Sequence, residues 1–376
     1  MPAVAITGLG VLSALGHGVE AFWANLLEGR RNADGAVPPF ERRAFARSPF
    51  GRRIDRTSLL ALAACRLALA DAGLAPEAAS GDRAGLCLGT ALGNLGETAG
   101  FLDRLFARGT ANPLVFPNLV LNAPLAYATI ELGITGPTAM VTEQEASGEA
   151  AIAHGVDLVA AERAAVCLAG GADELDRTLA AVLAEGRLLT RTVPRPLDPA
   201  ADGPALGEGA AVAVLEPLAA ARARGARVYA CVRAHPGFAV PAPVHGWAGD
   251  ARPVAVGLRP LLREVDVVFA GASGSPPRDA LEADALALAL EGRPALVTAV
   301  RGATGDFGAA GALDVAAAAL AVASGVVPPT LGTGPRPRAG LAVVREAPRR
   351  TAVRCAVVPG LARGGACRPL VIEAAA

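Results

Sequence analysis

Two acidic residues stand where a side chain could do chemistry on a substrate. Glu145, in the run TEQEASG, directly precedes a stretch expected to form a helix from Ser147, and Asp306 lies in the run ATGDFGAAG. Two facing carboxylates can split their pKa values and share a proton, which suits acid/base work. The six cysteines form no Cys-x-x-Cys pair, and the sequence holds no metal-binding or cofactor-binding motif. We therefore expect neither a metal site nor a bound cofactor.

The elements that must position these residues follow an alternating pattern. Short runs typical of strands alternate with alanine- and leucine-rich stretches typical of helices, in two successive series of similar rhythm. The pattern predicts an α/β protein with two duplicated halves, residues 1–220 and 221–376. The clearest expected helices are 58–71, 147–161, 279–290 and 308–323. The expected strands are 4–7, 85–89, 139–141, 164–169, 210–215, 228–232, 265–270, 296–300, 341–344 and 355–358. Residues 236–259, rich in Pro, Gly and Ala, are expected to form an irregular loop.

Composition sets aside several classes of function. Basic and acidic residues balance at 35 each, and no basic residue is a lysine. The densest arginine stretch, within residues 41–56, also holds Glu41 and Asp55, which argues against a nucleic-acid-binding surface. No uninterrupted apolar run reaches the length of a membrane span, and several cysteines lie in apolar runs, as in a reducing compartment. A cytoplasmic protein without a membrane segment is expected.

Several motifs that follow one another along the chain carry a family resemblance. They are VAITGLGVLSALGHG at the start, GITGPTAMVT, VCLAGGADE, RPLDPAADGPALGEGAAVAVLEP and GVVPPT. In order and spacing the chain resembles the β-ketoacyl-ACP synthase family of the thiolase superfamily from end to end. The resemblance implies a thiolase-like fold of five layers, α-β-α-β-α, that works as a dimer. It also implies a catalytic cysteine at a helix amino end and two histidines that promote malonyl decarboxylation and condensation.

The three catalytic positions of that family are all replaced. The cysteine position falls on Glu145, the first histidine position on Gly271 and the second on Asp306, and Arg301 stands for the usual lysine. A carboxylate is a poor nucleophile toward a thioester and would repel a developing oxyanion. Glycine offers no side chain at all. The resemblance therefore predicts that the chain does not condense acyl units by itself.

Within the family, these joint losses resemble the chain length factors that pair with ketosynthases in type II polyketide pathways. The run VVFAGASGSPPRDALEADA is similar to their degenerate histidine region, and LARGGACRPLVI, which holds Arg363, is similar to their carboxyl-terminal segment. In those factors a glutamine aligns with the cysteine. Two registers therefore stay open, with either Gln144 or Glu145 at the nucleophile position.

Three functional hypotheses follow from the resemblance. The first is a non-catalytic subunit that forms a heterodimer with an active ketosynthase, closes its acyl tunnel and meets acyl carrier protein through the complex. Phe116 and Leu119 are the candidates for the tunnel floor, with ordinary interface packing as the alternative. The second is an acyl- or malonyl-ACP decarboxylase, or a thioesterase-like enzyme, that uses Glu145 and Asp306. The third is a pseudoenzyme homodimer; polyketide and fatty-acid products both stay open.

Overall fold

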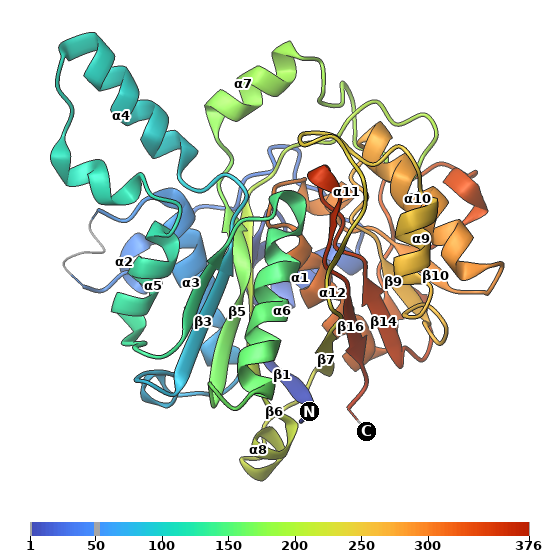
Figure 1. The fold of residues 1–376 in the computed structure, drawn as a ribbon, viewed down its shortest axis with the longest axis horizontal. Helices are drawn as coiled ribbons and strands as arrows, with labels where there is room; N and C mark the ends of the chain where they lie inside the picture. The colour runs from blue at the N-terminus through green and yellow to red at the C-terminus, as the bar shows by residue number, and fades with distance from the viewer. Residues whose placement is uncertain (1, 49–52, 376) are drawn as a thin grey trace.

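The polypeptide folds into alternating layers of helices and strands. The computed structural model describes residues 2–48 and 53–375, so residues 49–52 of the arginine-rich stretch lie outside the described part. Helices α3 (Arg56–Asp71) and α5 (Ala123–Leu132) cover one outer face, and α9 (Arg252–Leu258) and α10 (Pro276–Leu290) cover the other (Figure 1). Between the two sets of strands lie α6 (Ser147–Ala160) and α12 (Gly311–Ser324). The expected five-layered α/β fold is confirmed.

Five strands of each half lie in the same spatial order, and β12 (Ala342–Val343) adds one more strand beside β10. The first half runs β1-β6-β5-β3-β4 and the second β7-β16-β14-β9-β10, so each half places its first strand beside its fifth and its fourth beside its second. The two sets join where the start of β1 pairs with β7. This repeated order supports the predicted duplication, and the division at residue 220 stays a prediction. The strands are β1 (Val4–Ser13), β3 (Ala84–Gly89), β4 (Thr138–Val141), β5 (Val166–Asp173), β6 (Gly209–Pro217), β7 (Ala230–Ala234), β9 (Val267–Phe269), β10 (Leu296–Thr298), β14 (Cys355–Val358) and β16 (Leu370–Glu373).

The middle layer depends on helices made largely of small residues. In α12, GALDVAAAALAVAS, every residue from Gly311 to Ala321 is buried, as expected of a helix that is apolar on all sides. Alanine side chains let the strands of both halves approach the helix closely, and α12 contacts both sets. Asp314 is its one charged residue, and it lies only 1% exposed in this layer. A buried carboxylate in such a place needs a charged partner.

Most expected elements are found near their predicted positions, but the loop expected at 236–259 is partly wrong. Residues 252–258 form the helix α9. Pro253 is compatible with this helix because it lies in the first turn, where its missing N–H costs no hydrogen bond. Within this helix the buried side chains are those of Val254, Ala255 and Leu258. A two-residue strand, β8 (Phe238–Ala239), also pairs with β15 (Ala366–Cys367). Strand β16 was not among the expected strands, since it is a four-residue run directly behind a proline.

Three helical segments stand away from the layers at one end of the molecule. They are α4 (Leu95–Arg108), the 3-10 segment η3 (Pro113–Asn118) and α7 (Arg177–Glu185), with α4 and α7 at the top of Figure 1. None of the residues of α4 is buried. We call the exposed large apolar side chains of α4, η3 and the segment behind them the apical patch: Leu102, Leu105, Phe106, Leu114, Phe116, Val120 and Leu121. Exposed apolar side chains that gather on neighbouring segments are a candidate interaction surface.

The remaining elements are short. They are α1 (Gly18–Leu27), α2 (Arg42–Phe45), α8 (Leu218–Ala223), α11 (Arg301–Thr304), β2 (Gly16–His17), β11 (Val326–Val327), β12 (Ala342–Val343) and β13 (Arg349–Arg350). In the described ranges no helix is both long enough and apolar enough to span a bilayer.

Candidate functional site

The turn between β4 and α6 carries the position at which the resemblance places a nucleophile. Gln144 has φ 51°, in the left-handed region that non-glycine residues seldom adopt, and the 3-10 turn η4 (Gln144–Ala146) leads into α6. The hydroxyl of Ser147 fastens this turn: it accepts from the Glu143 N–H at 2.9 Å and donates to the Gln144 carbonyl at 2.7 Å. Gln144 is exposed and Glu145 half-buried. In either register, the residue at this turn is neither a thiol nor a hydroxyl.

The carboxylate of Glu145 is engaged by Arg363. Arg363 Nε lies 2.6 Å from Glu145 Oε1, and the backbone N–H of Arg363 donates to Oε2 at 3.1 Å. Arg368 makes two contacts of 2.6 Å with the carboxylate of Glu143. These two pairs tie residues 361–368 onto the nucleophile turn. Both oxygens of Glu145 accept a hydrogen bond from Arg363, so this carboxylate is oriented toward Arg363.

At Gly271 the missing side chain is replaced by the guanidinium of Arg278. A Cβ atom on Gly271 would lie 2.5 Å from Arg278 Nη2, closer than real Cβ contacts allow. Arg278 comes from the first turn of α10, is 1% exposed, and its guanidinium carbon lies 5.3 Å from the ring centre of Trp247. One turn further along α10, Glu282 accepts the Gly271 N–H at 2.9 Å. A side chain at this position would require the Arg278 guanidinium to move.

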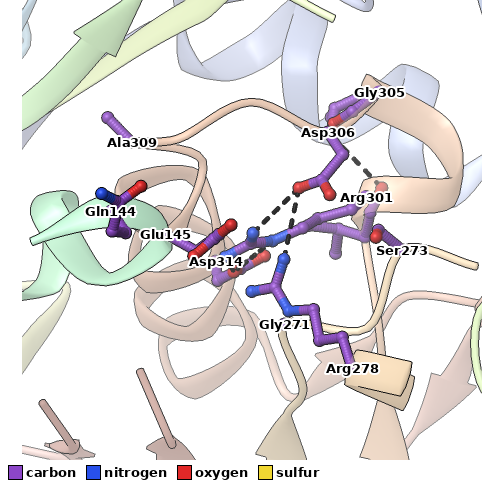
Figure 2. A network of polar contacts seen from close by, with 12 residues as sticks. Gln144, Glu145, Gly271, Ser273, Arg278, Arg301, Gly305, Asp306, Ala309 and Asp314 are labelled. Carbon is purple, nitrogen blue, oxygen red and sulfur yellow. Dashed lines mark hydrogen bonds and ion pairs between the residues drawn. The ribbon is translucent and has the colours of Figure 1, made fainter. Parts of the chain in front are cut away.

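Asp306 lies between two buried arginines (Figure 2). Its Oδ1 is 3.0 Å from Arg301 Nη1 and 3.4 Å from Arg278 Nη1. Burial opposes ionisation here, but the charges of Arg278 and Arg301 hold the pKa of Asp306 below its usual value. Asp306 is therefore an anion at neutral pH. It cannot donate a proton as a protonated imidazole does.

Further buried carboxylates surround these two arginines. Arg301 Nη2 lies 2.8 Å from Asp314 Oδ2 and 3.9 Å from Glu149 Oε1. Burial works against the charge of Arg301, yet the three neighbouring carboxylates raise its pKa above the ordinary value. Burial raises the pKa of Glu149 to about 7 and that of Glu282 to about 7, although the arginines oppose this effect. We call Arg278, Arg301, Asp306, Asp314, Glu149 and Glu282 the arginine cluster.

Glu145 and Asp306 do not form the carboxylate pair that acid/base work would need. Each binds a different arginine, and within residues 2–48 and 53–375 no hydrogen bond or ion pair joins the two. An ionised Asp306 beside two permanent cations is a poor proton donor and a weak base. Nor do the described residues include three or more His, Cys, Asp or Glu side chains arranged to hold a metal ion. In the described residues, the two carboxylates therefore do not bind one another as a pair that shares a proton would.

Of the two candidates for the tunnel floor, Phe116 lies in η3 and belongs to the apical patch, and Leu119 directly follows η3. Phe116 is 61% exposed and packs edge-on against Phe101, with ring centres 6.3 Å apart. Leu119 is half-buried. The neighbouring Asn118 holds the segment rigidly, since its side chain donates to the Arg53 carbonyl at 2.8 Å and accepts from the Tyr127 hydroxyl at 2.7 Å. Phe116 thus points out of its own chain and is not part of this chain's core.

Sequence reasoning missed four members of the arginine cluster: Arg278, Glu282, Glu149 and Asp314. All four lie within helices whose other buried residues are mostly apolar. A charged residue in an alanine-rich helix is a signal in itself, because burying it requires a partner of opposite charge. Arg278 and Glu282 also stand four apart on one helix, the spacing of neighbours on a helix face. Which charged residue of one helix pairs with which residue of another could not be predicted without the fold.

Comparisons with known proteins agree with this geometry. The N-terminal domain of β-ketoacyl synthases matches residues 1–221, and the C-terminal domain of the same family matches residues 256–333. The tetracenomycin polyketide synthase ketoacyl synthase beta subunit of Streptomyces glaucescens is 33% identical, with 98% of both chains covered. The alpha subunit of that synthase is 32% identical, with 96% of this chain and 95% of the other covered. The solved ishigamide ketosynthase/chain length factor superposes with a TM-score of 0.92 at 28% identity, over 100% of both chains.

The five layers, the repeated strand order and the turn before α6 define a protein of the thiolase-like class. With a domain match over more than half of its length, the chain belongs to the β-ketoacyl synthase family.

Proposed function

We propose that this chain is a non-catalytic subunit of the chain-length-factor kind, which forms a heterodimer with an active ketosynthase in polyketide synthesis. One observation carries the proposal. At all three catalytic positions of the family, the thiol and imidazoles are absent, and the space they would need is taken by the arginine cluster and the Glu145–Arg363 pair. A chain arranged in this way keeps the fold of a ketosynthase without its chemistry.

The free edge of the first sheet supports the pairing with a partner. Strand β4 is the last strand on its side, and its only partner in the described part of the chain is β3. An unpaired edge offers a row of backbone N–H and C=O groups to a strand of another chain. The apical patch adds apolar surface beyond this edge. Together, the free edge of β4 and the apical patch are suited to a large obligate interface, which buries on the order of 2,000 Å² or more.

The position of Phe116 supports a role in setting product length. The Phe116 side chain is 61% exposed in the lone subunit, so packing around its ring has to come from another molecule. In the proposed heterodimer, Phe116 and Leu119 enter the partner's acyl tunnel and close its far end. The acyl carrier protein then delivers its chain to the partner's cysteine and meets this subunit only through the complex.

Relatives that occur as named pairs favour a hetero-pair over a homodimer. The beta subunit of the tetracenomycin synthase and its alpha subunit are about equally similar to this chain, at 33% and 32% identity. The loss of all three catalytic positions supports a role as the kind of subunit that leaves catalysis to a partner.

Co-expression with a ketosynthase that carries an intact cysteine and both histidines tests the pairing. We expect a 1:1 complex in size-exclusion chromatography and a higher soluble yield than for the lone chain. Phe106→Glu, a change at an 82% exposed apical side chain, should weaken the complex, whereas Val244→Glu, at a 76% exposed position in the other half, should not. A chain that stays a stable monomer or homodimer beside that ketosynthase would contradict the proposal.

A further inference from the structure

We propose that Asp306 is the built-in occupant of a carboxylate-binding site formed by Arg278 and Arg301. Removing its side chain should open a site for a small free carboxylate such as formate or acetate. This inference goes beyond the proposed function, because it concerns only residues of this chain and does not depend on a partner.

The two arginines converge on one carboxylate oxygen from different elements. Arg278 belongs to α10 and Arg301 opens α11, yet both direct a guanidinium nitrogen to Asp306 Oδ1 (Figure 2). Guanidinium groups recognise carboxylates through charge-assisted hydrogen bonds, and two on one oxygen make a strong site. The arginine side chains are 2% and 0% exposed, so water competes little for them.

Both arginines are held in place by groups other than Asp306. Arg301 donates to Asp314 Oδ2 through Nε at 3.1 Å and Nη2 at 2.8 Å. Arg278 is packed beside Trp247 and fills the space left by Gly271. Its Nε is buried and has no hydrogen-bond partner within the described residues. The two guanidinium groups should therefore stay in place when the Asp306 side chain is removed.

The backbone around Asp306 is also fixed independently of its side chain. Its N–H donates to the Ala205 carbonyl at 2.8 Å, and its own carbonyl accepts the Gly207 N–H at 3.0 Å. The Asp306 side chain is 16% exposed, in contrast to the arginines behind it. A small anion can therefore reach the vacated place from the Asp306 side. The same carboxylate denies this place to any carboxylate-bearing acyl group.

The experiment is chemical rescue of two variants of different size. Asp306→Ala removes the carboxylate group alone, which matches formate in size, and Asp306→Gly also removes the methylene group, which matches acetate. Thermal unfolding of the full-length chain, in whichever assembly it purifies, is measured with sodium formate, acetate or chloride at equal ionic strength. A carboxylate at ten times its dissociation constant should raise the Tm of the matching variant by about 2 °C beyond the effect of chloride.

Three controls separate a built site from a general salt effect. Asp306→Asn keeps the site filled and should gain nothing from formate. Asp71→Ala removes another aspartate that binds an arginine, but Arg227 is 57% exposed, so formate should not rescue this variant. Wild-type protein should show no saturable binding of carbon-13-labelled formate by nuclear magnetic resonance. Saturable binding to the wild type that is lost in Arg278→Met would overturn the inference.

Equal Tm changes with formate, acetate and chloride in every variant would also overturn it. If both Asp306 variants are insoluble, refolding from urea gives the same comparison. A higher refolded yield with formate than with chloride supports the site. Equal yields contradict it.

Discussion

Restoring a histidine at Gly271 should destabilise the protein rather than repair its chemistry. A Cβ atom at this position would lie 2.5 Å from Arg278 Nη2, and an imidazole needs more room than a Cβ atom. Arg278 would have to leave its place beside Asp306 and Glu282. Overpacking of this kind costs about 1–3 kcal/mol. Breaking a buried ion pair costs about 3–5 kcal/mol, and the lower part of that range applies because Asp306 keeps Arg301.

Urea unfolding followed by circular dichroism measures the effect on the free energy of unfolding. We expect Gly271→His to lose about 4–7 kcal/mol in total, the sum of the overpacking cost and the broken ion pair. The control Gly249→His, where a Cβ atom meets nothing within 4 Å, should change stability by no more than about 0.5 kcal/mol. Adding Arg278→Ala to Gly271→His should recover part of the loss, with a coupling of about 0.5–3 kcal/mol. A Gly271→His protein as stable as wild type, or strictly additive changes, would refute the argument that Arg278 occupies the histidine's space.

Three further predictions concern other parts of the molecule. Phe116→Ala in the reconstituted pair should give longer products by mass spectrometry, with little loss of stability because the ring is 61% exposed. The control Phe22→Ala, at a fully buried ring, should lower the free energy of unfolding by about 3–5 kcal/mol. Unchanged product length would refute the tunnel role. Because burial raises the pKa of Glu282 from 4.5 to about 7, the folded protein holds a proton that the unfolded chain releases, so stability should fall as pH rises between these values. Glu282→Gln should remove about 3 kcal/mol of that fall in urea titrations from pH 4.5 to 8, and an unchanged slope would contradict the shift. Glu145→Cys should yield no condensation product from labelled malonyl-ACP, because Gly271 and Asp306 still supply no imidazole; a product would show that the imidazoles are dispensable.

The fold was largely predictable because its signals are local and repeated. Runs such as 85–89 and 355–358 are short, apolar and bounded by turns, and helices such as 147–161 are long and rich in alanine. The exceptions were elements whose residues carry mixed signals. Pro253 indicated a loop, yet its place in the first turn of α9 makes it compatible with a helix.

For the candidate site, the sequence indicated which catalytic positions are lost, which stays a prediction, but not which residues surround them. Register along the chain indicated that Glu145, Gly271 and Asp306 stand at the catalytic positions. It could not indicate that Arg363 binds Glu145, because the two are 218 residues apart and meet only through the fold. That Arg278 fills the space at Gly271 likewise depends on how α10 packs against the end of β9. Partners of buried charges are set by tertiary structure, and one sequence does not encode them in any local pattern.

The most direct test of the central claim is condensation by the chain with and without a partner. Labelled malonyl-ACP and an acyl primer are supplied to the purified chain alone, to a ketosynthase with an intact cysteine and both histidines, and to the co-purified pair. We predict no elongated product from the chain alone, and from the pair a product whose length differs from that of the ketosynthase by itself. Elongated product from this chain alone would contradict the account.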